Sequence, residues 1–161
     1  MTFRSEISSA PANLTSKGTI VAAVLAAASA AIIALSLAGG ISRDAAGLGL
    51  SAGGIVGAAI GMGLFWRLLV PRNGGYSIVY SVLAGLLAAI AAHVLAWLVF
   101  FIVASFAAAT SLPDIAKAFG LTISMLGTSV ILAAMITIPV CIAVSLAVTM
   151  WCRWQLGNRM F

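Results

Sequence analysis

The charged residues fall in a few short clusters, and this distribution constrains the fold more than any other feature. Of the 161 residues, 7% are charged and 63% are hydrophobic, whereas about 25% of the residues in soluble domains are charged. Between the clusters lie four predominantly apolar runs, each long enough for the ~20 residues that cross a bilayer core. The runs are Thr19 to Ala38, Ala45 to Val70, Tyr76 to Thr110 and Leu121 to Trp151. The sequence therefore predicts an all-α membrane protein with four transmembrane helices.

The positive charges predict the topology. If the N-terminus is cytoplasmic, six cations fall on the cytoplasmic side, and Arg43 and Lys117 fall on the far side. Because cytoplasmic loops are enriched in Lys and Arg, both termini are predicted to be cytoplasmic. The six are Arg4, Lys17, Arg67, Arg72, Arg153 and Arg159. An aromatic belt is predicted at the same level. Its members are Trp66, Tyr76, Tyr80, Trp151 and Trp154.

The predicted organisation is one transmembrane domain with a tail at each end. Residues 1–17 are expected to be a flexible cytoplasmic tail. Residues 18–155 form the four-helix domain, with spans at about 19–39, 46–70, 77–103 and 128–151, and residues 156–161 form a cytoplasmic C-terminal tail. The alternative of a cleaved secretory signal is disfavoured, because the apolar core from Ile20 to Leu37 exceeds the usual length of about 7 to 15 residues.

The third and fourth runs are longer than a bilayer requires, and the excess falls on the outer side. Ser111-Leu112-Pro113-Asp114 has the features of a helix start. Apolar residues follow at helical spacing: Leu112, Ile115, Phe119 and Ile123. A short outer amphipathic helix is therefore predicted over about 111–126. A steeply tilted long hairpin is the alternative for 104–130, and Pro139 predicts a kink in the fourth span.

Small residues at every fourth position predict close packing of the first two helices. In lipid, helix association depends on van der Waals contact, and small residues let two backbones approach. The alanine stripe is Ala22, Ala26, Ala30, Ala34 and Ala38, and the glycine stripe is Gly49, Gly53, Gly57 and Gly61. The helices are antiparallel neighbours, so the two stripes are predicted to face each other. Gly47, Gly54 and Gly63 lie off the stripe and indicate a second packing face.

Two polar residues are candidates for a functional role. Ser51 lies in Gly49 to Gly53, GLSAG, which fits the G-x-S-x-G pattern of a serine nucleophile. His93 is the single histidine and lies well inside the third span, where ionisable groups are functional candidates. Counting along the helices places the two at similar depth. A serine-histidine dyad of an intramembrane hydrolase is therefore a remote alternative.

Several features oppose the dyad. The GLSAG pattern lies within a continuous helix, not at a strand-to-helix turn. It also differs from rhomboid proteases, in which glycine follows the serine. An orienting acid and an oxyanion donor are missing. Ser51 is therefore interpreted as a small packing residue, and His93 as a neutral imidazole bonded to a Ser or Thr.

Other function classes lack the residues they need. One histidine cannot supply paired haem ligands, and no zinc ligand set is present. Glu6, Asp44 and Asp114 lie outside the spans, whereas a proton-coupled transporter needs a buried carboxylate. The net charge of +5 forms no basic patch for nucleic acid. No cofactor, metal or catalytic residue is predicted.

The expected function is therefore an interaction role. The sequence favours a small accessory, assembly or scaffold subunit of a larger membrane complex. Its expected partners are the lipid bilayer and other membrane subunits or further copies of itself, and its Ala- and Gly-rich composition suggests a bacterial inner membrane. The alternative is a small oligomeric channel or transporter, with the glycine face or the hydroxyl-rich fourth helix lining a path.

Overall fold

The computed structural model describes residues 12–37, 45–72, 75–108 and 112–157. Within these residues the fold has four long helices: α1 Ala12–Leu37, α2 Ala45–Leu69, α3 Ile78–Ala108 and α4 Leu112–Gly157. Each contains a segment long and apolar enough to cross a membrane. The antiparallel pair β1 Pro71–Arg72 and β2 Gly75–Tyr76 joins α2 to α3. The prediction of an all-α protein with four apolar membrane-length helices is confirmed.

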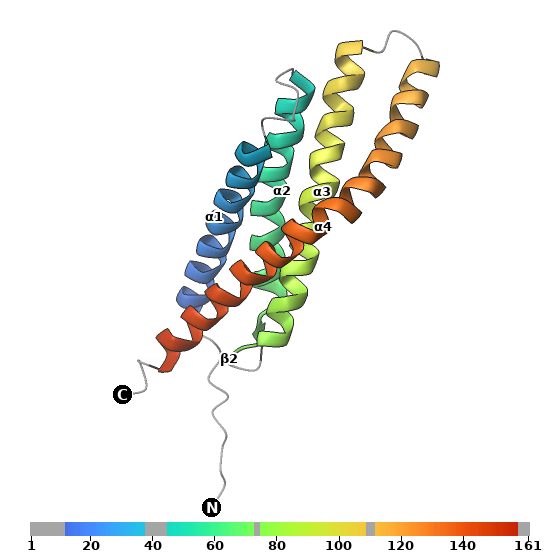
Figure 1. Ribbon diagram of the computed structural model, residues 1–161. Coiled ribbons are helices and arrows are strands. Elements are labelled where there is room, and N and C mark those ends of the chain that lie inside the picture. Colours follow the sequence, from blue (N-terminus) through green and yellow to red (C-terminus); the bar gives the residue numbers. More distant parts are fainter. Residues whose placement is uncertain (1–11, 38–44, 73–74, 109–111, 158–161) are drawn as a thin grey trace, which may run out of the picture.

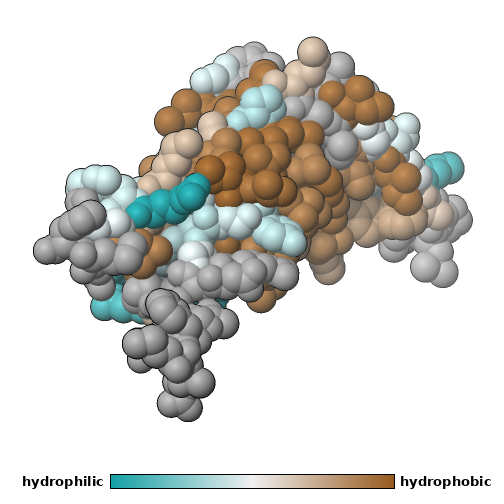
Figure 2. Space-filling model, turned by 90° about the horizontal axis from the view of Figure 1, so that it is seen from below, coloured by the Kyte–Doolittle hydropathy of each residue, from teal (hydrophilic) through white to brown (hydrophobic). Residues whose placement is uncertain are grey.

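The helices alternate in direction within one bundle, so Ala12 and Gly157 lie at the same end (Figure 1). The most extensive interface joins α2 and α3, while α1 packs on α2 and α4 crosses both α3 and α1. Viewed from below, hydrophobic side chains cover much of the molecule and hydrophilic ones form small patches (Figure 2). The hydrophobic flank suits a hydrocarbon environment, while many of the hydrophilic patches lie at the end nearest the viewer.

The first helix begins earlier than predicted. Residues 12–17 belong to α1, although the sequence assigns them to the tail. Leu14 is buried, and the hydroxyls of Thr15 and Tyr76 lie 3.3 Å apart at hydrogen-bond distance. These tertiary contacts extend the helix beyond its apolar run. The tail residues 1–11 lie outside the described part of the chain.

The glycine stripe of α2 packs against α3, so its predicted pairing with the alanine stripe is wrong. A Cβ added at Gly53 would lie 3.0 Å from the Cα of Ala96, and one at Gly57 would lie 2.9 Å from the Cα of Ala92. At these distances the two backbones are in contact. All four members of the stripe meet α3: Gly49, Gly53, Gly57 and Gly61.

The alanine stripe of α1 faces the interior of the bundle. Ala22 and Ala26 are buried, and Ala30 and Ala34 line an internal pocket, while Ala38 lies outside the described residues. The contact between α1 and α2 involves an off-stripe glycine instead. A Cβ added at Gly63 would lie 3.4 Å from that of Ala23. Of the off-stripe glycines, Gly63 therefore contacts α1, whereas Gly54 faces Ala96 of α3 and the surroundings of Gly47 are not described.

Two aromatic residues predicted for a belt belong to the core. Trp66 and Tyr76 are buried, and their rings stack with centroids 5.8 Å apart. The indole of Trp66 donates to the Thr149 hydroxyl at 3.1 Å, and that hydroxyl lies 2.5 Å from the Ser81 hydroxyl. This buried network joins α2, α3 and α4. Trp154, in contrast, is 61% exposed, as a belt residue would be.

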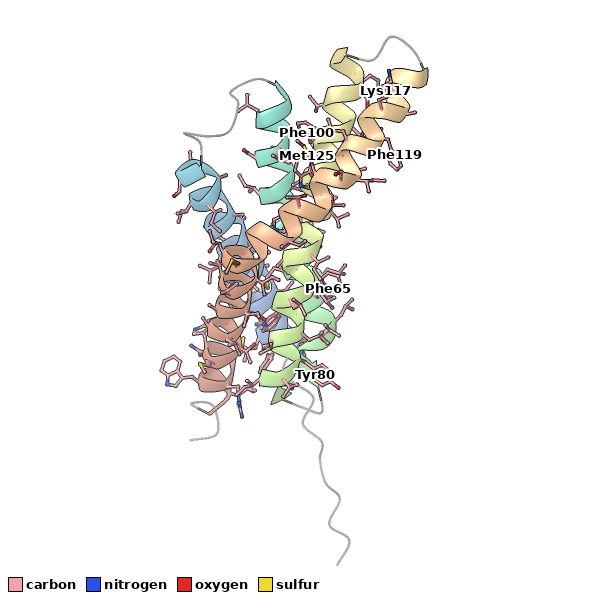
Figure 3. The ribbon with its side chains drawn as sticks, turned by 45° about the vertical axis from the view of Figure 1, so that its right-hand side comes forward. Phe65, Tyr80, Phe100, Lys117, Phe119 and Met125 are labelled. Atoms are coloured by element: carbon pink, nitrogen blue, oxygen red, sulfur yellow. The ribbon has the colours of Figure 1, made fainter. Side chains whose placement is uncertain are left out.

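The fourth helix is continuous over 46 residues. The predicted segments 111–126 and 128–151 are therefore not separate elements, because residues 112–126 and 128–151 both belong to α4, as in the long-hairpin alternative. Residue 111 lies outside the described part of the chain. Gly120 and Gly127 do not interrupt it, since glycine within a helix costs only ~1 kcal/mol relative to alanine. Pro139 lies inside α4, which changes direction near its middle (Figures 1 and 3). A bend is expected there because proline lacks a backbone N–H.

Candidate functional site

α4 changes direction between two contacts with α3, and we call this stretch of α4, residues 119–142, the bow. At one, a Cβ added at Gly85 would lie 2.6 Å from the Cα of Ile142. At the other, the rings of Phe101 and Phe119 lie edge to face, 5.6 Å between centroids. Between them α3 advances 16 residues (101 − 85) and α4 advances 23 (142 − 119). At ~1.5 Å per residue these are about 24 and 35 Å. The longer path of α4 includes the stretch with Pro139, where the helix changes direction (Figure 1).

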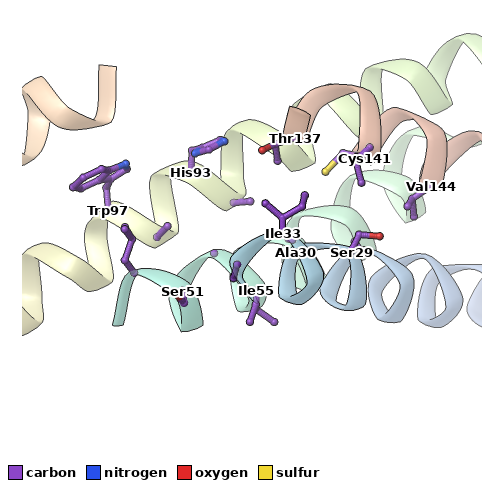
Figure 4. Close-up of a pocket in the computed structure, with 18 residues that line it drawn as sticks. Ser29, Ala30, Ile33, Ser51, Ile55, His93, Trp97, Thr137, Cys141 and Val144 are labelled. Carbon is purple, nitrogen blue, oxygen red and sulfur yellow. The ribbon is translucent and has the colours of Figure 1, made fainter. Parts of the chain in front are cut away.

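A pocket of about 250 Å³ lies beside this bow, lined by all four helices (Figure 4). Most of its wall is aliphatic. No Asp, Glu, Lys or Arg is among the described residues that line it. The lining residues with a polar or sulfur atom are Ser29, Ser51, His93, Trp97, Thr137 and Cys141.

His93 is one of the residues that line the pocket. Its Nε2 is buried and has no hydrogen-bond partner among the described residues. In Figure 4 the imidazole on α3 projects toward Thr137 on α4. The predicted hydrogen bond to a Ser or Thr is therefore not made through Nε2. Leaving a buried polar group unpaired costs about 1–3 kcal/mol.

Ser51 lines the same pocket from α2, as its predicted depth indicates. A dyad also requires a hydrogen bond between the serine and an imidazole nitrogen. The Nε2 of His93 makes none, and Ser51 lies within α2 rather than on a sharp turn. The structure thus brings the two side chains to one pocket, and Nε2 of His93 makes no hydrogen bond to Ser51.

Two of the α4 hydroxyls that could line a polar path are hydrogen-bonded, whereas the buried Ser145 hydroxyl has no partner among the described residues and Thr137 lines the pocket. Thr149 bonds with Trp66 and Ser81 in the core. Thr128 donates to the carbonyl of Ser124 in its own helix at 3.1 Å. Among the described residues, no group of three or more His, Cys, Asp or Glu could hold a metal ion.

The outer ends of α3 and α4 form a projecting hairpin, residues 101–108 and 112–128, which we call the outer arm. It rises beyond the ends of α1 and α2 (Figure 1), and Lys117 and Phe119 lie along it (Figure 3). From Phe119 to Thr128, Thr122 is buried and Leu126 is partly buried, whereas the other residues are exposed. On α3, Phe106 is 89% exposed. The arm thus presents a mainly apolar surface that the described residues leave uncovered.

Small residues interrupt that surface. A Cβ added at Gly120 or Gly127 would have no atom within 4 Å. The glycines of the α2 stripe, in contrast, touch α3 closely. The arm therefore combines large apolar side chains with sites at which a second helix could approach the backbone.

The sequence identified several residues that line the pocket, but it did not predict that a pocket lies beside the bend of α4. His93, Ser51, Ala30 and Ala34 were all singled out and all line it. Trp97, which also lines it, was not singled out as a candidate. The sequence signal for the pocket was Pro139 within a long apolar run, because a bend in this helix can leave space between it and its neighbours.

Comparison with known protein families, curated proteins and solved structures finds no match to this chain. The four long apolar helices define its class as a multi-pass integral membrane protein. Beyond this class, the outer arm and the pocket are the features from which a function can be inferred.

Proposed function

We propose that the protein is a small accessory subunit of a larger membrane complex and that the outer arm docks on a partner subunit. The observation that supports this most directly is the exposed apolar surface of the arm beyond the ends of α1 and α2.

The length of α3 supports a position of the arm at or beyond the outer interface. α3 has 31 residues, which is about 46 Å at ~1.5 Å per residue. A hydrocarbon core of about 30 Å could contain that length only at a tilt of about 50°, outside the usual range of about 0–40°. The outer end of α3, with the α4 segment packed on it, therefore leaves the core. We therefore infer that residues 112–126 lie at the outer interface, within a longer helix.

The distribution of Lys and Arg favours an orientation in which the outer arm faces away from the cytoplasm. Lys17, Arg67 and Arg153 lie near the end of the bundle where α1 begins and α4 ends, and Lys117 lies at the opposite end. The excess of cations assigns the first end to the cytoplasm. Both termini are then cytoplasmic and the arm lies outside, in what we take to be a bacterial inner membrane.

An apolar surface that lies outside the hydrocarbon core is stabilised when another protein buries it. Inside lipid the exposed side chains of the arm would be solvated by acyl chains, but at the outer interface they meet water and headgroups. Large exposed apolar patches in such settings mark protein contacts. Gly120 and Gly127 would let a partner helix approach closely. We infer that this partner is another membrane protein.

Purification from native membranes in mild detergent tests the proposal. The parent protein should elute with a different membrane protein in fixed stoichiometry. Ser124→Leu, on the exposed face of the arm, should weaken this association by about tenfold, because the bulkier side chain separates the helices. Ser36→Leu is the matched control, since Ser36 is also exposed but lies near the end of α1. A ring of identical copies without a foreign subunit would contradict the accessory role and favour the channel.

A further inference from the structure

We propose that the end of the bundle where α1 begins and α4 ends binds anionic phospholipids through three exposed cations, Lys17, Arg67 and Arg153, which we call the basic collar. Each cation binds the phosphate of one headgroup, and an acyl chain of that lipid lies along the apolar helix face beside it. The proposal rests on the collar and is independent of the outer arm.

One contact among three helices places the collar at a single level. A Cβ added at Gly18 of α1 would meet the ring of Trp66 on α2 and would lie 2.9 Å from Sγ of Cys152 on α4. The cations of the collar are chain neighbours of these three residues. Because α2 and α4 run opposite to α1, all three cations lie on the same side of this contact, toward the helix ends (Figure 1).

The collar lies at the depth expected for lipid headgroups. Lys17 is 5 residues from the start of α1 (17 − 12), and Arg153 is 4 residues from the end of α4 (157 − 153). Arg67 is 2 residues from the end of α2 (69 − 67). At ~1.5 Å per residue all three lie within about 8 Å of the helix ends. Each helix contains a segment apolar enough to span the membrane, and long cationic side chains near such ends reach the headgroups.

The charge of the collar favours an anionic headgroup. The three cations are exposed, and none of the side chains that the structure describes belongs to Asp or Glu. Within the described part of the chain, therefore, no ion pair neutralises them. Lys and Arg clusters beside membrane spans attract anionic lipids, and each cation near the surface raises the affinity about fivefold.

The apolar neighbours of the collar favour a lipid over a free anion. Three residues deeper in the bundle, each cation has a large exposed apolar residue on the same face of its helix. These residues are Ile20 on α1, Leu64 on α2 and Met150 on α4. On α2 the exposed row continues to Val56, 11 residues from Arg67 (67 − 56). This is about 17 Å, roughly one leaflet of a hydrocarbon core of about 30 Å, so an acyl chain can follow the row.

Native mass spectrometry of the full-length protein in detergent tests the proposal. The protein is exchanged into micelles that contain equal amounts of phosphatidylglycerol and phosphatidylcholine with identical acyl chains. The parent should retain one phosphatidylglycerol per cation, with about fivefold preference over phosphatidylcholine at each. Because the attraction is electrostatic, this preference should fall when NaCl is raised from about 0.1 to 1 M.

Single variants separate the three cations. Lys17→Gln, Arg67→Gln and Arg153→Gln should each remove one retained phosphatidylglycerol, whereas Arg67→Lys should keep it because the charge remains. The triple glutamine variant should retain the two lipids equally. Lys117→Gln is the control and should behave like the parent, since Lys117 is also exposed but lies at the opposite end, one helical turn after Asp114.

Each variant must elute like the parent in size-exclusion chromatography and retain its helical circular dichroism, and the salt dependence of the parent tests the proposal without any variant. Equal retention of the two lipids by the parent would overturn the proposal and leave the collar to an acidic partner protein. An equal loss in Lys117→Gln and in the collar variants would overturn it as a non-specific attraction. Displacement of the lipid by inorganic phosphate, beyond that by chloride at equal ionic strength, would show that the collar binds a free anion instead.

Discussion

Individual glycines in this bundle have opposite environments that their sequence spacing does not reveal. Gly85 has the closest backbone contact among the described glycines, against Ile142 of α4, yet it belongs to neither predicted stripe. Gly127 lies in open space. Spacing identifies a face of small residues, but which neighbour covers it depends on the positions of all the helices. For this reason the glycine stripe was predictable from the sequence and its partner helix was not.

This contrast predicts opposite effects of the same substitution. Gly85→Ala should lower the free energy of unfolding by about 1–3 kcal/mol, because its Cβ would lie 2.6 Å from a backbone atom of α4. Gly127→Ala should be neutral or stabilising by up to about 1 kcal/mol, since alanine favours the helix and meets no atom within 4 Å. Denaturation in mixed micelles measures both. Equal effects would show that α3 and α4 do not approach closely at Gly85.

A second residue-scale prediction concerns the core network. Thr149→Val removes the hydroxyl that pairs with the Trp66 indole and with Ser81. It should destabilise the protein by about 1–3 kcal/mol, because buried polar groups lose their partner while the volume is kept. Thr128→Val is the control, since Thr128 is exposed and bonds only its own helix. Comparable losses in both would argue against a special role for the buried network.

At the scale of elements, the helix number and most boundaries followed from apolar runs, whereas the path of α4 did not. Hydropathy records where a helix is apolar but not how it is tilted. The bow arises because two contacts, one at Gly85 and one at Phe101, are separated by more residues on α4 than on α3. Such a mismatch is a tertiary property. Pro139 indicated the bend, but the pocket beside it required the positions of the other helices.

Removing Pro139 tests how the bend is maintained. Pro139→Ala restores a backbone N–H and should favour a straighter α4, which draws its outer half away from α3. Spin labels attached at Ile102→Cys and Lys117→Cys, both exposed positions, measure the distance between α3 and α4. This distance should be longer and more broadly distributed in the Pro139→Ala variant than in the parent. Ile136→Ala, an exposed site in the same stretch, should leave it unchanged. If Pro139→Ala also leaves it unchanged, the proline does not contribute to the bend.

At the scale of the whole molecule, the bundle has two regions that differ in packing. The half near the start of α1 is closed by the buried Trp66 network. Toward the other end lie the pocket and then the outer arm, whose apolar surface is exposed. The sequence predicted this class of protein from its apolar runs. It also predicted extra length on the outer side, as an amphipathic helix or a long hairpin, but not which surface of that segment the neighbouring helices leave exposed.

The most direct test of the accessory role is photocrosslinking in native membranes from single positions. A photoreactive amino acid at Phe106 on the arm, 89% exposed, should crosslink to a different membrane protein. The same group at Leu35 near the end of α1, 76% exposed, should react with lipid alone. This difference is the result that the proposed docking of the arm predicts. Crosslinks to lipid alone at both positions would contradict it.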